Sequence, residues 1–208
     1  MAGNAAAAAS CAAGYLIGSV PFGLIVGKAV GGLDVRDFGS GNMGTANVLR
    51  TVGARAGAIT FALDVGKGAA AIGVARALGA DRTTQAAAGL AACVGHSWPV
   101  FAKFRGGKAV ATAFGALVLV SPEAAAWATV GGLGALAASH TMSVGSLTAT
   151  GTATFGAALE SARRHDAVPL VFTALASALV IVRHAPNIRR IVRGEEPKLS
   201  MRLWGSRH

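Results

Sequence analysis

The sequence contains little charge and few aromatic side chains. Only 13% of its 208 residues are charged and 6% are aromatic, whereas 53% are hydrophobic and the mean hydropathy is +0.54. Charged side chains are costly in hydrocarbon, and here they lie in the gaps between long apolar runs. This distribution argues against a separate soluble domain and predicts that the chain lies in a bilayer.

Acidic residues are especially scarce. Nine Asp and Glu stand against 19 Lys and Arg, which gives a net charge of +10. In a soluble protein such a charge would suggest nucleic acid as a partner. The basic residues, however, separate apolar runs, and no aromatic-rich basic surface accompanies them. We therefore expect membrane lipids, and no nucleic acid, as partners.

Cysteine and clustered metal ligands are also lacking. The two cysteines, Cys11 and Cys93, fall in separate apolar segments, and we interpret them as small buried hydrophobic residues instead of a disulfide. The histidines stand far apart, and their spacing matches no zinc or di-metal site. The sequence thus predicts no metal and no other cofactor.

Seven apolar runs follow one another and predict an all-α, polytopic integral membrane helix bundle that forms a single domain, residues 1–208. The runs are Ala5–Val30, Ala54–Leu78, Thr84–Phe101, Ala109–Val120, Pro122–Ala138, Val144–Leu159 and Val168–Val182. A full span needs about 20 residues, so the shorter runs are expected to be tilted, to lie in a thinned bilayer or to be re-entrant. Seven transmembrane helices place the two termini on opposite sides.

The boundary between the fourth and fifth runs carries its own signal. The stretch "SPE" at 121–123 offers a Ser N-cap, a Pro at the first helical position and an acid in the first turn. It predicts two separate helices at this point. If these two helices form a re-entrant hairpin, five spans remain and the sidedness of the termini is unchanged.

Basic residues are distributed unevenly between the two sides of this topology. With the N-terminus outside, fourteen Lys and Arg lie inside and four lie outside, and Lys67 is left within a helix. Cytoplasmic loops carry the excess of Lys and Arg in membrane proteins. The sequence therefore predicts an outside N-terminus, a cytoplasmic C-terminus and three polar loops on the cytoplasmic side.

The first loop, "DVRDFGSGNMGTANVLRTVG" at residues 34–53, has almost nothing to bury. Its glycines Gly39, Gly41 and Gly44 permit positive φ and let main-chain N–H groups approach an anion. Short polar side chains and one cation accompany them, namely Ser40, Asn42, Thr45, Asn47 and Arg50. On its own, this loop is equally typical of an ordinary turn.

The second loop is "GHSWPVFAKFRGGKAVAT" at residues 95–112. Gly106, Gly107 and Lys108 precede the helical run that begins at Ala109, so free N–H groups, a helix dipole and an ammonium group could converge on a phosphate. The Walker A spacing is absent, so nucleotide hydrolysis is not indicated. The alternative reading of these basic residues is a collar at the lipid headgroups.

The third loop, "RHAPNIRRIVRGEEPKL" at residues 183–199, follows the last apolar run. His184 and Asn187 are spaced i, i+3 and can approach one ligand from the same helical face. The arginines after them are suited to anionic headgroups. Three loops on one side, each with groups that bind phosphate, predict a phosphorylated substrate at the cytoplasmic membrane surface.

The motifs in these loops, in their order and spacing, resemble those of the bacterial membrane glycerol-3-phosphate acyltransferases that use acyl-phosphate as donor, the PlsY family. The resemblance covers nearly the whole chain. It rests on "GSVPFG" at 18–23, "GSGNMGTANVLRTVG" at 39–53, "DVGKG" at 64–68, "GHSWPVFAKFRGGKAVAT" at 95–112, "SVGSL" at 143–147 and "HAPNIRRIVRGEE" at 184–196.

The resemblance implies an enzyme of seven transmembrane helices in the bacterial cell membrane, with its N-terminus outside and its active site on the cytoplasmic side. It also implies acyl-phosphate and glycerol-3-phosphate as substrates. Acyl transfer to the sn-1 hydroxyl would give 1-acyl-glycerol-3-phosphate, which is lysophosphatidic acid, and inorganic phosphate. This reaction belongs to phospholipid biosynthesis.

The family's motifs also imply roles for individual residues. The predicted catalytic residues are Ser40, Lys108, His184 and Asn187. The predicted substrate-binding residues are Gly39, Gly41, Asn42, Gly44, Asn47, Arg50, His96, Gly106, Gly107 and Glu196. The general base is left open between His184, His96 and a bound phosphate.

Two departures from the family's pattern bear on fine substrate preference. Thr45-Ala46 stands where the family usually has Ala-Thr, and Ala109 stands where a Gly is common. The changed stretch keeps an acyltransferase paralogue with a different acceptor as an alternative. The H-x-x-x-x-D motif of acyltransferases that use acyl-CoA or acyl-carrier protein occurs at none of the histidines.

A membrane transporter of an organic phosphate is the alternative from another class. It could use Gly-rich breaks and basic residues, but inverted repeats and polar breaks at the bilayer midplane would be expected, and neither is visible. One polar pair does lie inside a run, because Asp64 and Lys67 are spaced i, i+3 in the second. It is interpreted either as a neutralising pair near the interface or as part of the cleft lining.

Overall fold

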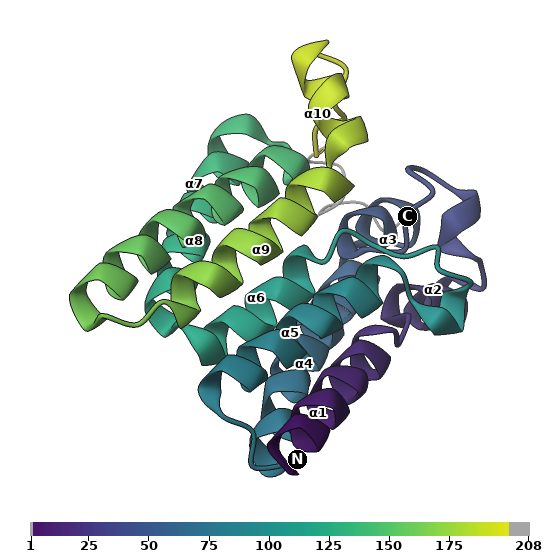
Figure 1. Ribbon diagram of the computed structural model, residues 1–208. Helices are drawn as coiled ribbons and strands as arrows, with labels where there is room; N and C mark the ends of the chain where they lie inside the picture. The colour runs from purple at the N-terminus through teal and green to yellow at the C-terminus, as the bar shows by residue number, and fades with distance from the viewer. Residues whose placement is uncertain (1, 200–208) are drawn as a thin grey trace.

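The computed structural model describes residues 2–199, and this part of the chain folds into a bundle of helices (Figure 1). In order, they are α1 (Ala2–Gly18), α2 (Phe22–Gly31), the 3-10 turn η1 (Val35–Asp37), α3 (Thr45–Thr51), α4 (Ala54–Ala77), α5 (Arg82–Ser97), the 3-10 turn η2 (Val100–Ala102), α6 (Val110–Val120), α7 (Pro122–Ser139), α8 (Met142–Arg164), α9 (Val168–Arg183) and α10 (Ala185–Val192). Arg202 and Arg207, counted in the predicted basic tail, lie outside the described residues.

Each predicted apolar run is mainly helical, and the last six each contain one α-helix, α4 to α9. The third run was expected to continue to Phe101, but α5 ends at Ser97 and η2 follows Pro99. The first run differs, because it divides into α1 and α2 at residues 19–21. The cause is Pro21, which lacks an N–H group and disfavours helical geometry in the residue before it. The structure also contains α3 and α10, which are too short and polar for a hydropathy pattern to indicate.

The predicted boundary at "SPE" is confirmed. Ser121 caps α7, and its hydroxyl accepts a hydrogen bond from the Ala124 N–H at 3.0 Å. Pro122 occupies the first helical position, where a missing N–H removes no helical hydrogen bond. The chain therefore ends α6 and starts α7 within a single residue.

Glycine allows α4 and α6 to pack with their backbones nearly in contact. A Cβ at Gly68 would lie 2.0 Å from the Thr112 carbonyl oxygen, and one at Gly115 would lie 1.9 Å from the Val65 carbonyl oxygen. Small residues at helix interfaces are common in membrane bundles, where close packing replaces the hydrophobic effect as the driving force. This contact fixes the position of α6, whose first turn reaches the candidate site.

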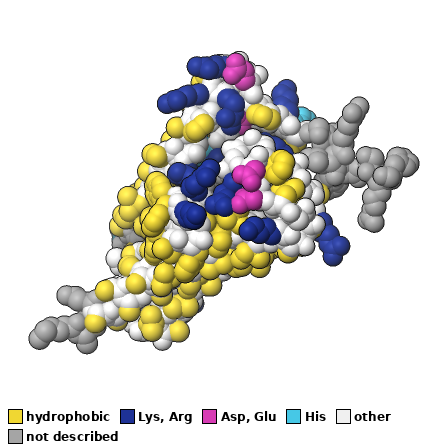
Figure 2. Space-filling model, turned by 90° about the vertical axis from the view of Figure 1, so that its right-hand side faces the viewer, with side chains coloured by type: hydrophobic (Ala, Val, Ile, Leu, Met, Phe, Trp, Pro, Cys, Tyr) yellow, Lys and Arg dark blue, Asp and Glu magenta, His cyan; other side chains and the backbone are white. Residues whose placement is uncertain are grey.

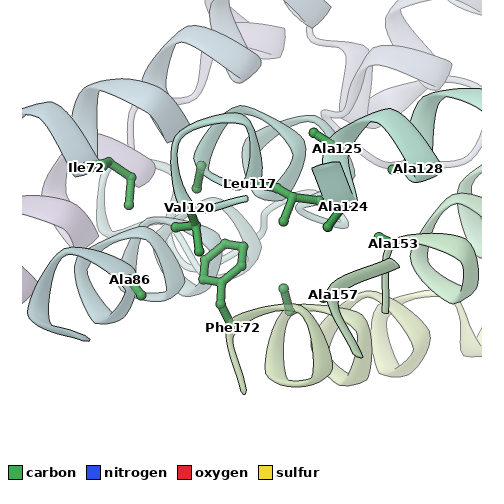
Figure 3. Close-up of a cluster of buried hydrophobic side chains, with 12 residues drawn as sticks. Ile72, Ala86, Leu117, Val120, Ala124, Ala125, Ala128, Ala153, Ala157 and Phe172 are labelled. Carbon is green, nitrogen blue, oxygen red and sulfur yellow. The ribbon is translucent and has the colours of Figure 1, made fainter. Parts of the chain in front are cut away.

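A second interface is built around one aromatic residue. Phe172 of α9 is 1% exposed and points toward Leu117 and Val120 of α6 (Figure 3). The surrounding cluster is mainly alanine from α5, α7 and α8, and it contains Ile72 of α4 as well. One large side chain among small ones lets six helices meet in a single core.

Much of the bundle surface is apolar. On α7, Val130 and Leu133 are 73% and 61% exposed, and Figure 2 shows hydrophobic side chains over most of one face below a region rich in Lys and Arg. Within the described residues, Ala5–Gly31 and α4 are long and apolar enough to cross a membrane, and α9 with α10, bent by 64°, makes a third candidate. This surface is suited to contact with lipid.

The two ends of the bundle differ in their elements. One end, called the site end below, carries α2, α3, η2 and α10 (Figure 1). The other, called the far end, carries the start of α1 and the α4–α5, α6–α7 and α8–α9 connections. All three predicted polar loops lie at the site end.

Candidate active site

The site end holds a cavity of about 150 Å³, called the polar cavity below, whose walls come from all three predicted loops. Its lining consists of Ser40, Asn42, Gly44, Thr45, Ala46, Asn47, Arg50, Phe61, Asp64, His96, Lys108, Ala109, Val110, Ala111, Met142, Ser143, Ser146, His184, Asn187 and Glu196. Every predicted site residue lies in this lining except four glycines, Gly39, Gly41, Gly106 and Gly107. Residues more than 140 positions apart in the sequence thus share one cavity.

The first loop is held in shape by Asn47. Its amide nitrogen donates to the carbonyl oxygens of Val35 at 2.6 Å and Phe38 at 3.1 Å, and its amide oxygen accepts from the Ser40 N–H at 2.9 Å. These bonds occupy both ends of the amide and shape the loop that presents Ser40, and the role of Asn47 in substrate binding stays a prediction.

Two of the three predicted conformational glycines adopt the backbone that the sequence suggested. Gly39 has φ 61° and Gly41 has φ 67°, in the left-handed region that favours glycine. The expectation was wrong for Gly44, which has φ −77° and caps α3. Its N–H donates to the Asn42 side-chain oxygen at 2.8 Å, so it tightens the turn.

The glycines of the second loop serve packing instead of conformation. Neither Gly106 nor Gly107 has positive φ, and the Gly107 N–H is already donated to the His96 carbonyl oxygen at 3.0 Å. The prediction that this N–H is free for a phosphate is therefore wrong. The first turn of α6, which begins at Val110, supplies such groups, because helix N-termini leave their first N–H groups unsatisfied.

Arg183 and Asn42 join the three loops, and the role of Arg183 was missed in the sequence. The Arg183 guanidinium donates to the carbonyl oxygens of Gly107 at 3.0 Å and Gly106 at 3.2 Å, and it lies 5.3 Å from the centre of the Trp98 ring. The side chain of Asn42 also donates to the Gly106 carbonyl at 3.4 Å. A basic residue after the last helix is ordinary topology signalling, so no local signal singled out Arg183.

Lys108 is the cation of the second loop in the cavity wall. Burial, together with repulsion from Arg190, Arg50 and Arg183, lowers the pKa of Lys108 to about 8, although Glu196 opposes the effect. Lys108 is thus mainly protonated at neutral pH. A phosphate beside it would relieve the repulsion among these cations.

Arg50 supplies a second positive charge from α3. Its Nε is buried and forms no hydrogen bond with any described residue. A buried cationic donor without a partner costs free energy unless a ligand satisfies it. Arg50 and Lys108 therefore make the polar cavity suited to an anion.

His184 lies between α9 and α10 and is 2% exposed. Its Nδ1 lies 2.8 Å from the Val180 carbonyl oxygen, which can only accept, so Nδ1 carries the proton and Nε2 is the free acceptor. Burial and the charge of Lys108 lower the pKa of His184 to about 4. The imidazole is neutral at physiological pH.

Glu196 organises the third loop. Its carboxylate accepts from Asn187 at 2.6 Å, Arg190 at 2.7 Å and Ser143 at 2.7 Å. Burial raises the pKa of Glu196, but these hydrogen bonds and the charge of Arg190 outweigh it and leave the pKa lowered. These contacts suit Glu196 to orienting Asn187, and its role in substrate binding stays a prediction. Ser143, from the "SVGSL" stretch, had not been predicted as a site residue.

An apolar cavity of about 370 Å³ continues from the polar one. It lies among α6, α7, α8 and α9, and it shares Phe61, Val110, Met142 and Ser146 with the polar cavity. Eleven of the other seventeen lining residues are aliphatic or aromatic, and the rest are Gly, Thr and Ser. A molecule with a charged head and a hydrocarbon tail fits such a pair of cavities.

A third hollow of about 300 Å³ adjoins the polar cavity on its basic side. It shares Ser40, Asn42, Lys108 and Asn187 with that cavity and adds Arg183 and Arg190 among its walls. Anionic groups can therefore be accommodated on both sides of Lys108. No group of three or more His, Cys, Asp or Glu residues that could hold a metal ion occurs among residues 2–199.

Comparison with known sequences places this site in a family. Residues 8–194 match the family described as glycerol-3-phosphate acyltransferase. The chain is 43% identical to the glycerol-3-phosphate acyltransferase of Rubrobacter xylanophilus over 198 residues, covering 92% of this chain and 94% of that protein. It is 45% identical over 193 residues to that of Anaeromyxobacter dehalogenans, covering 90% and 94%.

Solved structures show the same fold. The crystal structure of PlsY (YgiH), an integral membrane glycerol 3-phosphate acyltransferase, in its glycerol 3-phosphate form has a TM-score of 0.85 at 35% identity, covering 93% of this chain and 96% of that one. Its lysophosphatidic acid form has a TM-score of 0.83 at 34% identity, covering 95% and 97%. By sequence and by structure, this chain belongs to the glycerol-3-phosphate acyltransferase family of integral membrane proteins.

Proposed function

We propose that the protein transfers an acyl group from acyl-phosphate to the sn-1 hydroxyl of glycerol-3-phosphate and releases lysophosphatidic acid and inorganic phosphate. One observation carries this proposal: the cavity lined by Lys108 and Arg50 shares four lining residues with an apolar cavity among α6, α7, α8 and α9. The reaction joins a water-soluble dianion to a lipid chain, and this site offers a region for each. The forms in which PlsY was crystallised, with glycerol 3-phosphate and with lysophosphatidic acid, support the same substrate and product.

The cations of the polar cavity and the N-terminus of α6 bind phosphate. Lys108 and Arg50 neutralise phosphate charge, and the first turn of α6 offers N–H groups and a favourable dipole. Ser40 and Asn187 stand on opposite loops and orient the two reactants. These groups supply positioning and charge stabilisation, which are large catalytic terms when the donor is already activated.

The acyl chain occupies the apolar cavity. Phe61, Val110 and Met142 surround the passage between the two cavities and hold the reacting carbonyl where tail and head meet. Because most of its lining is apolar, the cavity can hold a long chain without polar contacts.

The chemical step needs no covalent enzyme intermediate. The sn-1 oxygen attacks the carbonyl carbon of the acyl-phosphate, an ester bond forms, and the bond from that carbon to the phosphate oxygen breaks. Phosphate leaves with the electron pair, and the hydroxyl proton must pass to a base.

The leaving phosphate is the better base of the candidates. The pKa of His184, about 4, makes its imidazole a weaker base than a phosphate dianion, since even a phosphate monoester, which is less basic than free phosphate, has a second pKa of about 6. His184 instead accepts a hydrogen bond from the hydroxyl through Nε2 and orients it. The proton then passes to a phosphate oxygen, which balances the reaction.

The membrane arrangement follows from the charges. We propose seven spans, with α1 and α2 forming one broken span, the N-terminus outside and the site end on the cytoplasmic side of the bacterial cell membrane. The basic residues of the site end and the apolar surface below them support this orientation (Figure 2). It would let water-soluble glycerol-3-phosphate enter the site from the cytoplasm and phosphate return to it.

The test is a donor comparison with purified protein in detergent. Palmitoyl phosphate with glycerol-3-phosphate should give lysophosphatidic acid and phosphate in equal amounts, and palmitoyl-CoA should give none. Product from palmitoyl-CoA alone would overturn the donor assignment. Binding of glycerol-3-phosphate with no product from either donor would favour transport, and turnover only with another alcohol would favour a paralogue with a different acceptor.

A further inference from the structure

An ion pair buried in the bundle lies directly behind the second loop. Asp64 and Lys67 occupy positions i and i+3 of α4, with 2.9 Å between Oδ1 and Nζ, and each side chain is only 2% exposed. Buried ion pairs are often no more stabilising than apolar residues of similar volume. A contribution to folding stability therefore does not by itself explain why this ion pair is buried.

Lys67 is fixed from the side of the broken first span. Its ammonium donates to the Val20 carbonyl oxygen at 3.0 Å, and it lies 5.7 Å from the centre of the Phe22 ring. Both contacts come from the "GSVPFG" stretch, where Pro21 divides α1 from α2. The break between these helices thus holds one end of the ion pair.

Asp64 faces the active site from the other end of the pair. Its Oδ1 lies 3.6 Å from Nδ1 of His96, and both residues line the polar cavity. That Nδ1 is buried and forms no hydrogen bond within residues 2–199. The Asp64 carboxylate is therefore the charged group next to this face of the imidazole.

His96 in turn supports the second loop. Besides the bond from the Gly107 N–H to its carbonyl oxygen, a Cβ at Gly107 would lie 1.9 Å from His96 Nε2, and one at Gly106 would lie 2.2 Å from its carbonyl oxygen. The two glycines rest against His96 with no room for a side chain. Any movement of this ring would be passed to Lys108, the next residue.

We propose that Asp64 and Lys67 are positioning residues for the phosphate-binding loop. The ion pair fixes the ring of His96, the ring fixes Gly107, and Gly107 sets the position of the Lys108 ammonium and the first turn of α6. This inference deepens the proposed function, because it rests on the assignment of Lys108 to phosphate. It gives a role to the "GSVPFG" and "DVGKG" stretches, which do not carry the chemistry themselves.

The test measures phosphate affinity and turnover together. Asp64→Asn keeps the shape of the side chain but removes its charge. We expect affinity for inorganic phosphate, measured by isothermal titration, to fall at least tenfold. The value of kcat/KM should fall about 100-fold, the loss expected for a reacting group displaced by about 1 Å.

A second variant shows whether a loss of phosphate affinity comes from misfolding. Asp64→Asn leaves Lys67 buried without its partner, whereas Asp64→Asn combined with Lys67→Met removes both charges and leaves neither unpaired. The double variant should fold and still bind phosphate at least tenfold more weakly than the parent. Glu160→Gln, which alters a buried carboxylate at the far end, is the matched control and should keep parental phosphate affinity.

A mutant cycle with His96 separates positioning from a general structural effect. If Asp64 acts through His96, then Asp64→Asn should cost less than threefold in kcat/KM in a His96→Asn background. Fully multiplying losses would overturn the proposal, and so would a folded double variant with parental phosphate affinity. Failure of the parent to turn over would count against the proposed function, while the phosphate affinities would still test the positioning role.

Discussion

The two ends of the bundle use their charges in different ways. At the far end, Arg82 pairs with Asp166 at 2.6 Å, and Arg163 pairs with Glu123. At the site end, Asp34 binds Arg36 at 2.7 Å and Glu196 binds Arg190 at 2.7 Å. Lys108 and Arg50 form salt bridges with none of the described residues.

Charges that stabilise the fold can therefore be told apart from charges that can bind a ligand by whether they have a partner. Paired charges at the far end tie neighbouring helices and connections together, and their loss should affect stability. Cations without carboxylate partners raise the free energy of the empty cavity, and an anionic substrate lowers it again. The same residue types thus serve packing at one end and binding at the other.

Removing a site-end cation should have the largest effect. Lys108→Met deletes the ammonium that faces phosphate, and we expect kcat/KM to fall at least 100-fold with no loss of thermal stability. Arg163→Gln is the matched control, because it removes a paired cation at the far end, and its kcat/KM should stay within twofold of the parent. Steady-state kinetics and thermal unfolding of both variants in detergent would check this contrast. Similar losses of activity in the two variants would remove the distinction between the ends.

The pH dependence of kcat/KM should follow the protonation of Lys108. The pKa of Lys108 is about 8, and the protonated form binds phosphate, so kcat/KM should fall as pH rises through 8, by about tenfold per unit beyond it. Lys108→Arg keeps its charge at higher pH and should move this fall upward. Rate profiles from pH 6 to pH 10 would test it. An unchanged alkaline limb in the arginine variant would assign the limb to another group.

Part of the fold and of the site could be predicted from the sequence, because strong local patterns indicate them. Apolar runs predicted α4 to α9, and the capping signal at Ser121 predicted the α6–α7 boundary. The three loops could be expected to meet because charge asymmetry put them on one side. Their contents also matched a family pattern, which gave most of the cavity lining.

What the sequence missed depends on contacts across the bundle. Arg183 and Ser143 act through partners 77 and 53 positions away, and no local pattern records such distances. The glycines at 106 and 107 were expected to be free for an anion, but close packing on His96 explains them. The partners of Glu196, Asn187 and Ser143, are likewise visible only in three dimensions.

A far-end carboxylate should affect stability more than activity. Glu160 is 5% exposed, bonds the Ser121 hydroxyl and lies 3.5 Å from the Arg164 guanidinium. Glu160→Gln removes the ion pair and weakens the hydrogen bond, so we expect a loss of about 2 kcal/mol in unfolding free energy. Turnover should remain within twofold of the parent. A loss of turnover greater than twofold in the folded variant would place this end of the bundle in catalysis.

The smallest effect is expected at Ala109, one of the two departures from the family's pattern. Ala109 has φ 60°, a left-handed conformation that costs about 1 kcal/mol in a residue with a Cβ. Ala109→Gly should therefore raise the free energy of unfolding by about 1 kcal/mol and leave kcat/KM within twofold. Thermal unfolding of the purified variant measures it. A less stable glycine variant would mean that the buried methyl group contributes more than the strain costs.

The most direct test of the central claim is isothermal titration of glycerol-3-phosphate into the parent protein and Lys108→Met, without any acyl donor. If the unpaired cations of the site end exist to bind a phosphorylated substrate, the parent should bind and the variant should bind at least tenfold more weakly. Equal affinities in the two proteins would contradict the account, because the polar cavity would then not be where the phosphate is held.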